Sequence, residues 1–121
     1  MNWRLVLADD DPTLRRLLRV LLERDGRFEV VGEAADGREA IALLGEADPD
    51  LLLLDLAMPH MDGLEVLVEL DGRTRPVVVV LTGFTEQALC DQVLALGARA
   101  CLQKGNDFAS LADRLVDAVA A

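Results

Sequence analysis

The run Leu51–Leu54, followed at once by Asp55, is the feature that most restricts what this chain can fold into. Four consecutive leucines are typical of a β-strand that is buried on both faces, as in a parallel sheet covered by helices. An ionised carboxylate inside such a strand would lose its hydration, so Asp55 must lie beyond the carboxyl end of the strand. Ligands of open α/β sheets bind at that edge. We therefore expect Asp55 to be the reactive group of the protein.

The rest of the chain alternates between apolar strand patterns and helical patterns. Strands are expected at residues 4–8, 28–34, 51–54, 77–81 and 100–103. Helices are expected to begin near Pro12, Glu39, Gly63, Thr85 and Asp107. Such βα units with short loops predict a doubly wound α/β fold, with a five-stranded parallel sheet between two layers of helices. We expect one domain over residues 1–121 and no output domain in this chain.

The first helix is predicted to be amphipathic, beginning at Asp11-Pro12 and ending at Gly26. Leucines at helical spacing predict one buried stripe, formed by Leu14, Leu17, Leu18, Leu21 and Leu22. The opposite face is expected to be solvated and carries Arg15, Arg16, Arg19 and Arg24. The strand at 28–34 is less apolar than the others, which favours a position at the edge of the sheet.

The composition of the chain limits which partners it can bind and in which cellular compartment it is expected. A formal charge of −10 argues against nucleic-acid binding by this domain, because binding to phosphates needs a basic surface. No apolar run approaches the roughly 20 residues of a membrane span, and the N-terminus lacks a signal-peptide pattern. We expect a cytoplasmic protein. Cys90 and Cys101 are too few for a disulfide framework and are expected to be ordinary buried thiols.

Polar residues follow four of the expected strands: Asp9-Asp10, Asp55, Thr82 and Lys104. Parallel strands bring their carboxyl ends to one edge, so these side chains are expected to share a cleft. Two carboxylates about 4 Å apart repel by roughly 4 kcal/mol at an effective dielectric near 20, which favours a bound cation. Oxygen ligands alone favour Mg²⁺. With a hydroxyl donor and a lysine nearby, the set suits phosphoryl transfer to Asp55.

The ordered set resembles the receiver domain of bacterial two-component response regulators over essentially the whole chain. The residues that carry the resemblance are Asp9-Asp10, Asp55, Met58-Pro59, Met61-Asp62-Gly63, Thr82-Gly83 and Lys104. It implies a flavodoxin-like sheet of order 2-1-3-4-5. It also implies that Asp55 is the phosphoacceptor, phosphorylated by a sensor histidine kinase or a phosphotransfer protein.

The resemblance assigns further roles. Mg²⁺ (or Mn²⁺) would be bound by Asp10, Asp55 and the Ala57 backbone carbonyl, with Asp9 acting through a water. Thr82 and Lys104 would bind phosphoryl oxygens. The domain would not be an enzyme beyond its own phosphorylation and slow autodephosphorylation. It would switch an output such as transcription regulation, and the fourth helix, fifth strand and fifth helix would form the face for a homodimer.

Several positions depart from the usual pattern of the family. Cys101 stands three residues before Lys104, where many members have the aromatic residue whose rotation reports phosphorylation. Gly105 replaces a common proline and resembles the subfamily with helix-turn-helix output domains. Ala57 and Phe84 occupy the two positions that tune dephosphorylation. Neither side chain can orient a water, so we expect the Asp55 phosphate to hydrolyse slowly.

Two other functions remain open at this point. A receiver-like interaction module could act without phosphate, and Cys101 keeps that alternative open. The run Asp9-Asp10-Asp11-Pro12-Thr13 also resembles the nucleophile motif of haloacid-dehalogenase-type phosphatases. Asp9 would then be the nucleophile and Asp11 the acid, but this role leaves Asp55 unexplained. His60, the one histidine, is expected to be exposed and inert.

Overall fold

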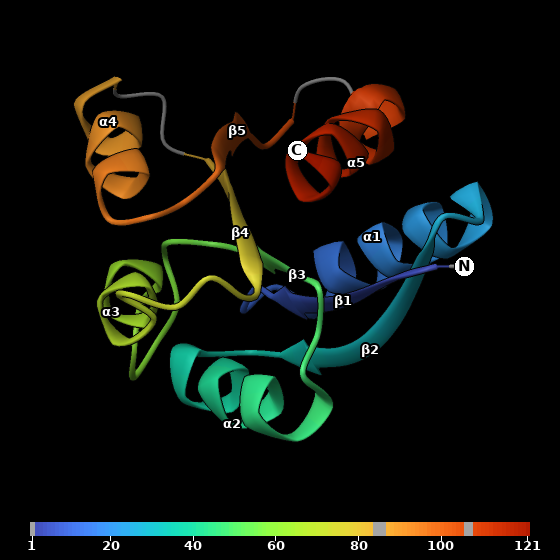
Figure 1. The fold of residues 1–121 in the computed structure, drawn as a ribbon. Helices are drawn as coiled ribbons and strands as arrows, with labels where there is room; N and C mark the ends of the chain where they lie inside the picture. The colour runs from blue at the N-terminus through green and yellow to red at the C-terminus, as the bar shows by residue number, and fades with distance from the viewer. Residues whose placement is uncertain (1, 84–86, 106–107) are drawn as a thin grey trace.

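The computed structural model describes residues 2–83, 87–105 and 108–121 (Figure 1). The strands are β1 (Trp3–Ala8), β2 (Phe28–Ala34), β3 (Leu51–Leu54), β4 (Val77–Thr82) and β5 (Ala100–Gln103). The helices are α1 (Pro12–Asp25), α2 (Gly37–Ala47), α3 (Gly63–Glu69), α4 (Gln87–Ala95) and α5 (Leu111–Ala120). A short 3₁₀ turn, Phe108–Ser110, precedes α5. The predicted alternation of strands and helices is confirmed.

The strands form one parallel sheet of order β2-β1-β3-β4-β5, as predicted. β2 lies at an edge, which explains its weaker apolar character. In the centre of the sheet, Ala8 pairs with Leu54, and Leu54 pairs with Val80. The carboxyl ends of β1 and β3 are therefore level, and the residues that follow them leave the sheet at the same height.

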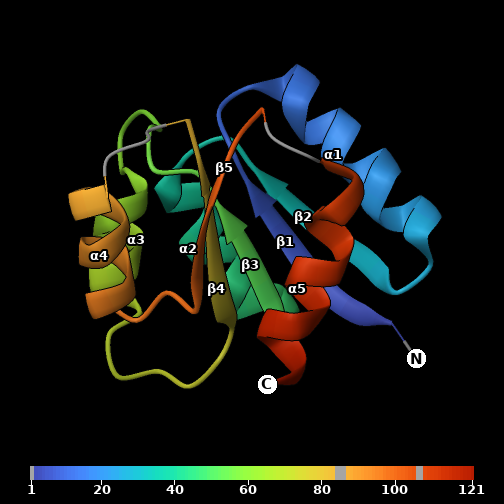
Figure 2. The same ribbon diagram turned by 90° about the horizontal axis from the view of Figure 1, so that it is seen from above.

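Helices cover both faces of the sheet. Figure 2 shows α1 and α5 on one side, and α2, α3 and α4 on the other. Alternate residues of each central strand enter the two layers: Leu51 and Leu53 pack under α1 and α5, whereas Leu52 and Leu54 face the other layer. All four leucines are buried. A strand that must fill two cores has no polar position, which is why this segment reads as a continuous apolar run.

The buried stripe of α1 is narrower than predicted. Leu18 and Leu22 are buried, but Leu17 and Leu21 are 45% and 38% exposed. The prediction counted every leucine at helical spacing, whereas a helix lying flat on a sheet buries mainly the positions that point directly at it. The start of this helix agrees with the prediction, since Asp11 accepts hydrogen bonds from the backbone of Thr13 and Leu14.

The first residues of the other helices can be compared with the predicted ones. α2 begins at Gly37, where Asp36 caps it, rather than at Glu39. α3 begins with a capping box in which Asp62 and Glu65 exchange side-chain and backbone hydrogen bonds. The expected caps at Thr85-Glu86 and Asp107 lie outside the described residues. In the part of the chain that is described, no helix has both the length and the apolar character needed to cross a bilayer.

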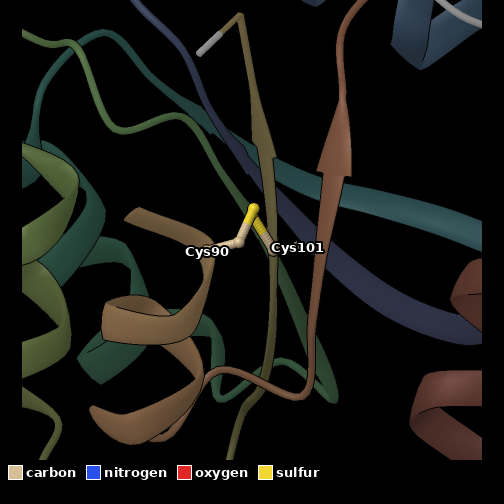
Figure 3. The surroundings of a disulfide bond; sticks show 2 residues. All are labelled: Cys90 and Cys101. Atoms are coloured by element: carbon tan, nitrogen blue, oxygen red, sulfur yellow. A yellow bond between two sulfur atoms is a disulfide. The ribbon is translucent and has the colours of Figure 1, made fainter. Parts of the chain in front are cut away.

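The expectation of two ordinary buried thiols is wrong. Cys90 of α4 and Cys101 of β5 form a disulfide, with Cα atoms 5.6 Å apart (Figure 3). Both residues are partly exposed. The prediction rested on the number of cysteines and on compartment. Neither indicates that α4 packs against β5 and so brings together two residues separated by 11 positions.

Candidate functional site

Backbone hydrogen bonds of the sheet continue for one residue past the strand ends and align the site. The Asp9 N–H donates to the last residue of β2 over 3.0 Å, and the Asp55 N–H donates to the last residue of β1 over 2.8 Å. On the other side, the Lys104 N–H donates to the Thr82 carbonyl over 2.7 Å. These residues are therefore placed by the rigid sheet rather than by loops.

Three carboxylates meet at this edge. Asp9, Asp10 and Asp55 each offer an oxygen atom, and these atoms lie within 4.8 Å of one another. Asp9 and Asp55 are only 4% and 5% exposed, whereas Asp10 is exposed. Burial makes their mutual repulsion costly, so the cluster needs positive charge.

Lys104 supplies positive charge from within the protein. Its Nζ lies 2.7 Å from Asp9 Oδ2 and 3.2 Å from Asp55 Oδ2, so one ammonium bridges the two buried carboxylates. It is the only lysine in the chain. The other oxygen of Asp9 accepts the Asp11 N–H over 2.9 Å. Asp9 is thus held by contacts on both carboxylate oxygens.

The electrostatic surroundings shift the pKa values of two groups. Burial, followed by the charge of Asp9, raises the pKa of Asp55, although Lys104 and a hydrogen bond from the Ala57 backbone act in the opposite direction. Burial alone would lower the pKa of Lys104. The hydrogen bond to Asp9 and the charges of both carboxylates outweigh burial and raise it. Lys104 is consequently a permanent cation, while Asp55 carries a destabilised negative charge.

An open cleft of about 620 Å³ gives access to the acidic cluster. Asp10 and Ala57 line it near the cluster. Apolar residues form most of its remaining wall, namely Leu56, Met58, Pro59, Leu64 and Leu89, with Asp62. Ala57 is exposed, and its side chain ends at a methyl group. A group of at least the size of a phosphate can therefore approach from this side.

Gly63 allows the loop after Asp55 to fold back closely. A Cβ atom at this position would overlap the Asp55 carbonyl oxygen and would lie 2.8 Å from Leu56 Cα. The Gly63 N–H donates to the Leu56 carbonyl over 3.0 Å. The start of α3 is thereby packed directly against the backbone of Asp55 and Leu56, which explains the glycine in Met61-Asp62-Gly63.

Arg15 is a residue of the site that the sequence analysis missed. It was assigned to a solvated face, yet its side chain is only 17% exposed. Nη1 donates to the Asp9 backbone carbonyl over 2.6 Å, and Nε donates to Glu33 of β2 over 3.3 Å. Arg19 holds the other oxygen of Glu33 at 2.7 Å. No local signal marks this role, because it depends on how α1 lies over the ends of β1 and β2.

The remaining predicted residues are placed as follows. Thr82 is the last residue of β4 and is buried next to the Lys104 backbone, so it lies at the predicted edge. Cys101 is bonded to Cys90 instead of being a free side chain in the aromatic position. His60 is exposed, as expected, and has a positive φ of 65°. Phe84 lies outside the described residues.

The fold and this acidic edge can be compared with known proteins. The family model of the response regulator receiver domain matches residues 5–116. This chain belongs to the response regulator receiver family. Receiver domains are phosphoacceptor signalling domains of two-component systems and are generally not enzymes. They bind Mg²⁺ through acidic residues and interact with histidine kinases or phosphotransfer proteins.

Similar proteins agree with this assignment. The signal receiver domain of the response regulator NarL from Mycobacterium tuberculosis has a TM-score of 0.92 and 32% identity, covering 99% of this chain and 98% of that chain. A two-component response regulator of the LuxR family from Aurantimonas sp. SI85-9A1 has a TM-score of 0.92 and 30% identity, covering 99% and 86%. The transcriptional regulatory protein PdtaR from Mycobacterium tuberculosis is 37% identical over 84% of this receiver chain and 49% of its own length.

The curated relatives are transcriptional regulators that are longer than this chain. The alignments cover 36% of BtsR from Salmonella typhi, 51% of YdfI from Bacillus subtilis and 49% of PdtaR. The chain therefore spans about half the length of these proteins or less. What it shares with them is the receiver domain.

Proposed function

We propose that Asp55 is the phosphoacceptor of this receiver domain, and that the phosphodonor is a phosphohistidine of a sensor kinase or a phosphotransfer protein. The single observation that carries the proposal is the Lys104 ammonium between Asp9 and Asp55, 2.7 and 3.2 Å from their oxygens. A fixed cation beside a buried carboxylate favours an incoming phosphoryl group, whose charge would otherwise be repelled by the acidic cluster.

The residues present fit a divalent metal. Asp10 and Asp55 would bind Mg²⁺ (or Mn²⁺) directly with the Ala57 backbone carbonyl, and Asp9 would act through a water. All these ligands are hard oxygen donors, which Mg²⁺ and Mn²⁺ prefer. When bound, the metal neutralises charge on the phosphoryl oxygens. Asp10 is the exposed member of the cluster and lines the cleft, so a hydrated ion can reach it.

Transfer of the phosphoryl group to Asp55 needs only a few side chains of the protein. An oxygen of the Asp55 carboxylate attacks phosphorus, the bond between phosphorus and the donor imidazole nitrogen breaks, and the imidazole leaves with the electron pair of that bond. Thr82 donates its hydroxyl hydrogen to one phosphoryl oxygen, and Lys104 pairs with another. Both are held at the edge of the sheet, so catalysis consists mainly of positioning and charge neutralisation.

The phosphorylated domain is proposed to lose its phosphate slowly. Hydrolysis needs an in-line water, and the methyl side chain of Ala57 cannot orient one. Phe84, the second position expected to matter, has no hydrogen-bonding group either. A half-life of minutes to hours in Mg²⁺ buffer is expected, whereas loss within seconds would contradict this part of the proposal. Ala57→Asn, which adds a side-chain amide beside Asp55, is expected to shorten the half-life.

We further propose that this receiver domain occupies residues 1–121, resides in the cytoplasm with its kinase, and controls transcription through a helix-turn-helix output. The named relatives are transcriptional regulators, and the LuxR and NarL neighbours support this class of output. Phosphorylation would be transmitted through the face formed by α4, β5 and α5, where a homodimer would form. Mass measured by light scattering with and without phosphorylation tests the dimer.

Locating the adduct tests the main proposal. The chain is incubated with Mg²⁺ and acetyl phosphate, and the modified residue is mapped after borohydride reduction of the acyl phosphate. Modification at Asp55 is expected, and Asp55→Asn abolishes it. Modification at Asp9 would instead indicate the phosphatase-like chemistry. No modification at all would indicate an interaction module that acts without phosphate.

A further inference from the structure

The disulfide between Cys90 and Cys101 joins two elements that extend from the proposed site. α4 is the first element after β4, whose last residue is Thr82. β5 ends at Gln103, one residue before Lys104. Cys101 is paired in register with Val80 of β4. Val80 precedes Thr82 by two residues and Cys101 precedes Lys104 by three, so the bond lies close along the sheet to the residues that are proposed to bind the phosphoryl group. Figure 3 shows the two cysteines joined by the bond.

Among the described side chains of α4, few are buried. Val93 is fully buried, while Leu89 of α4 and Leu96, the residue after the helix, are partly buried and pack against the core beneath α2 and α3. Cys90 lies one helical turn before Val93, so both point towards the sheet. Cys101 packs against the same cluster from β5, an edge strand that pairs only with β4 among the described strands. A covalent link between α4 and this strand consequently adds a constraint where packing is limited.

We propose that Cys90 and Cys101 are a redox modification site that sets how firmly α4 is held against β5. The proposal rests on the proposed function for its cellular setting, since cytoplasmic thiols are kept reduced and disulfides there are mostly transient or redox-sensing. The fold holds the two residues with Cα atoms 5.6 Å apart, within the range that a disulfide requires. Both side chains are partly exposed, so a small thiol or disulfide can reach them.

Oxidation proceeds by exchange with a low-molecular-weight disulfide such as glutathione disulfide. One cysteine thiolate attacks a sulfur of that disulfide, forming a mixed disulfide and releasing one thiol. The thiolate of the second cysteine then attacks the sulfur atom of the first cysteine in this mixed disulfide. The Cys90–Cys101 bond forms, and the other small thiol is released. The protein loses two protons and two electrons, and the small disulfide gains both. Excess dithiothreitol reverses the reaction.

The two redox states differ in the freedom of α4. In the oxidised state, the helix cannot separate from β5 without bending the link. In the reduced state, this covalent restraint on local opening is absent. Because a cross-link removes conformations of the open state, oxidation is expected to slow hydrogen exchange of α4 amides by about tenfold or more. Oxidation is also expected to reduce the response of α4 to changes at Asp55, since α4 is the element that follows β4 in the chain.

The test compares the oxidised and reduced forms of the whole chain. The protein is equilibrated with glutathione disulfide or dithiothreitol, and the loss of two hydrogens is measured by intact mass. Hydrogen exchange is then followed in peptides covering residues 87–96, with α1 peptides as an internal control. Slower exchange confined to α4 and β5 in the oxidised form is expected. Cys90→Ser, which cannot form the bond, should exchange at the same rate in both buffers.

Two results would overturn the proposal: thiols that stay reduced in excess glutathione disulfide, or α4 exchange that is equal in both states. The comparison of the two unsubstituted forms stands even if the serine variant folds poorly. A second measurement adds Mg²⁺ and beryllium fluoride, a phosphoryl analogue. A smaller change in α4 exchange is expected in the oxidised form, and an equal change would overturn the regulatory role. If beryllium fluoride has no effect in either form, the proposed function fails while the redox dependence remains.

Discussion

Replacement of Lys104 by methionine is predicted to destabilise the folded protein at neutral pH. The variant keeps the length and apolar stem of the side chain but removes the ammonium that bridges Asp9 and Asp55 at 2.7 and 3.2 Å. Two buried carboxylates would then repel each other without an internal cation. The loss should therefore depend on pH and on added metal, unlike a loss of packing.

The size of this loss of stability follows from the distances between the Lys104 ammonium and the two carboxylates, and from the burial of these groups. At an effective dielectric near 20, each ammonium–carboxylate contact is worth about 5 to 6 kcal/mol before desolvation is subtracted. Removing one partner of a buried pair costs about 3 to 5 kcal/mol overall. Because Lys104 is 22% exposed, we expect the lower limit, about 3 kcal/mol. For 121 residues, an unfolding entropy of about 0.25 kcal/mol/K converts this loss into a fall in Tm of about 12 °C.

The pH dependence of the loss has a definite sign. Burial and the charge of Asp9 raise the pKa of Asp55, and Lys104 partly opposes this, so the variant raises the pKa further. Between the unfolded pKa and the higher folded pKa, the folded state holds a proton that the unfolded state has released. Ionisation in this interval lowers stability as pH rises. The deficit should be smallest at acid pH, below the unfolded pKa of Asp55, and should grow as pH rises through the raised folded pKa.

Thermal unfolding of Lys104→Met in metal-free buffer across this pH range is the assay. Arg73→Met, which removes an exposed positive charge outside the cluster, is the matched control and should change Tm little. Millimolar Mg²⁺ should restore more stability to Lys104→Met than to the control. Equal stability of the two variants, or a deficit that does not change with pH, would refute the electrostatic reasoning.

Three other substitutions test separate parts of the site. Gly63→Ala should lower the free energy of unfolding by about 1 to 3 kcal/mol, because its Cβ would overlap the backbone after β3. Gly45→Ala, in open space within α2, should raise the free energy of unfolding by up to about 1 kcal/mol. Chemical denaturation compares the two variants. Arg15→Met removes the hydrogen bond to the Asp9 carbonyl and should lower the free energy of unfolding by about 1 to 3 kcal/mol. It should also weaken Mg²⁺ binding measured by calorimetry. The matched variant Arg16→Met, at an exposed neighbour, should show neither effect. Mg²⁺ at about a hundredfold excess over its Kd should stabilise the protein by about 2.7 kcal/mol, and Asp10→Asn should lose this gain in thermal scans.

Much of the fold could be predicted because the strands of a doubly wound sheet carry a strong local signal. The bounds of β2, β3 and β5 agree with the sequence analysis, and the order of the strands followed from the resemblance to receiver domains. The stripe on α1 was predicted less well. Spacing identifies a helical face, but how much of that face is covered depends on the angle at which the helix meets the sheet.

The acidic edge was also predictable, since parallel strands deliver the residues after their carboxyl ends to one place. Asp9, Asp10, Asp55 and Lys104 do meet there. What could not be predicted was which atoms would pair. The bridge formed by Lys104, and the hydrogen bond from Arg15 to the Asp9 carbonyl, depend on distances of a few ångströms between separate elements.

Asp55 illustrates what the sequence by itself determined. A run of leucines must be buried and a carboxylate must leave it, so the position of Asp55 beyond the end of the strand follows from the cost of desolvation alone. The tertiary structure decided the rest: the shared ammonium, the raised pKa of Asp55, and the pairing of Cys90 with Cys101. A continuous apolar run indicates a buried strand from the sequence alone, but the contacts between separate elements depend on how the helices pack on the sheet. Only the folded chain brings those partners together.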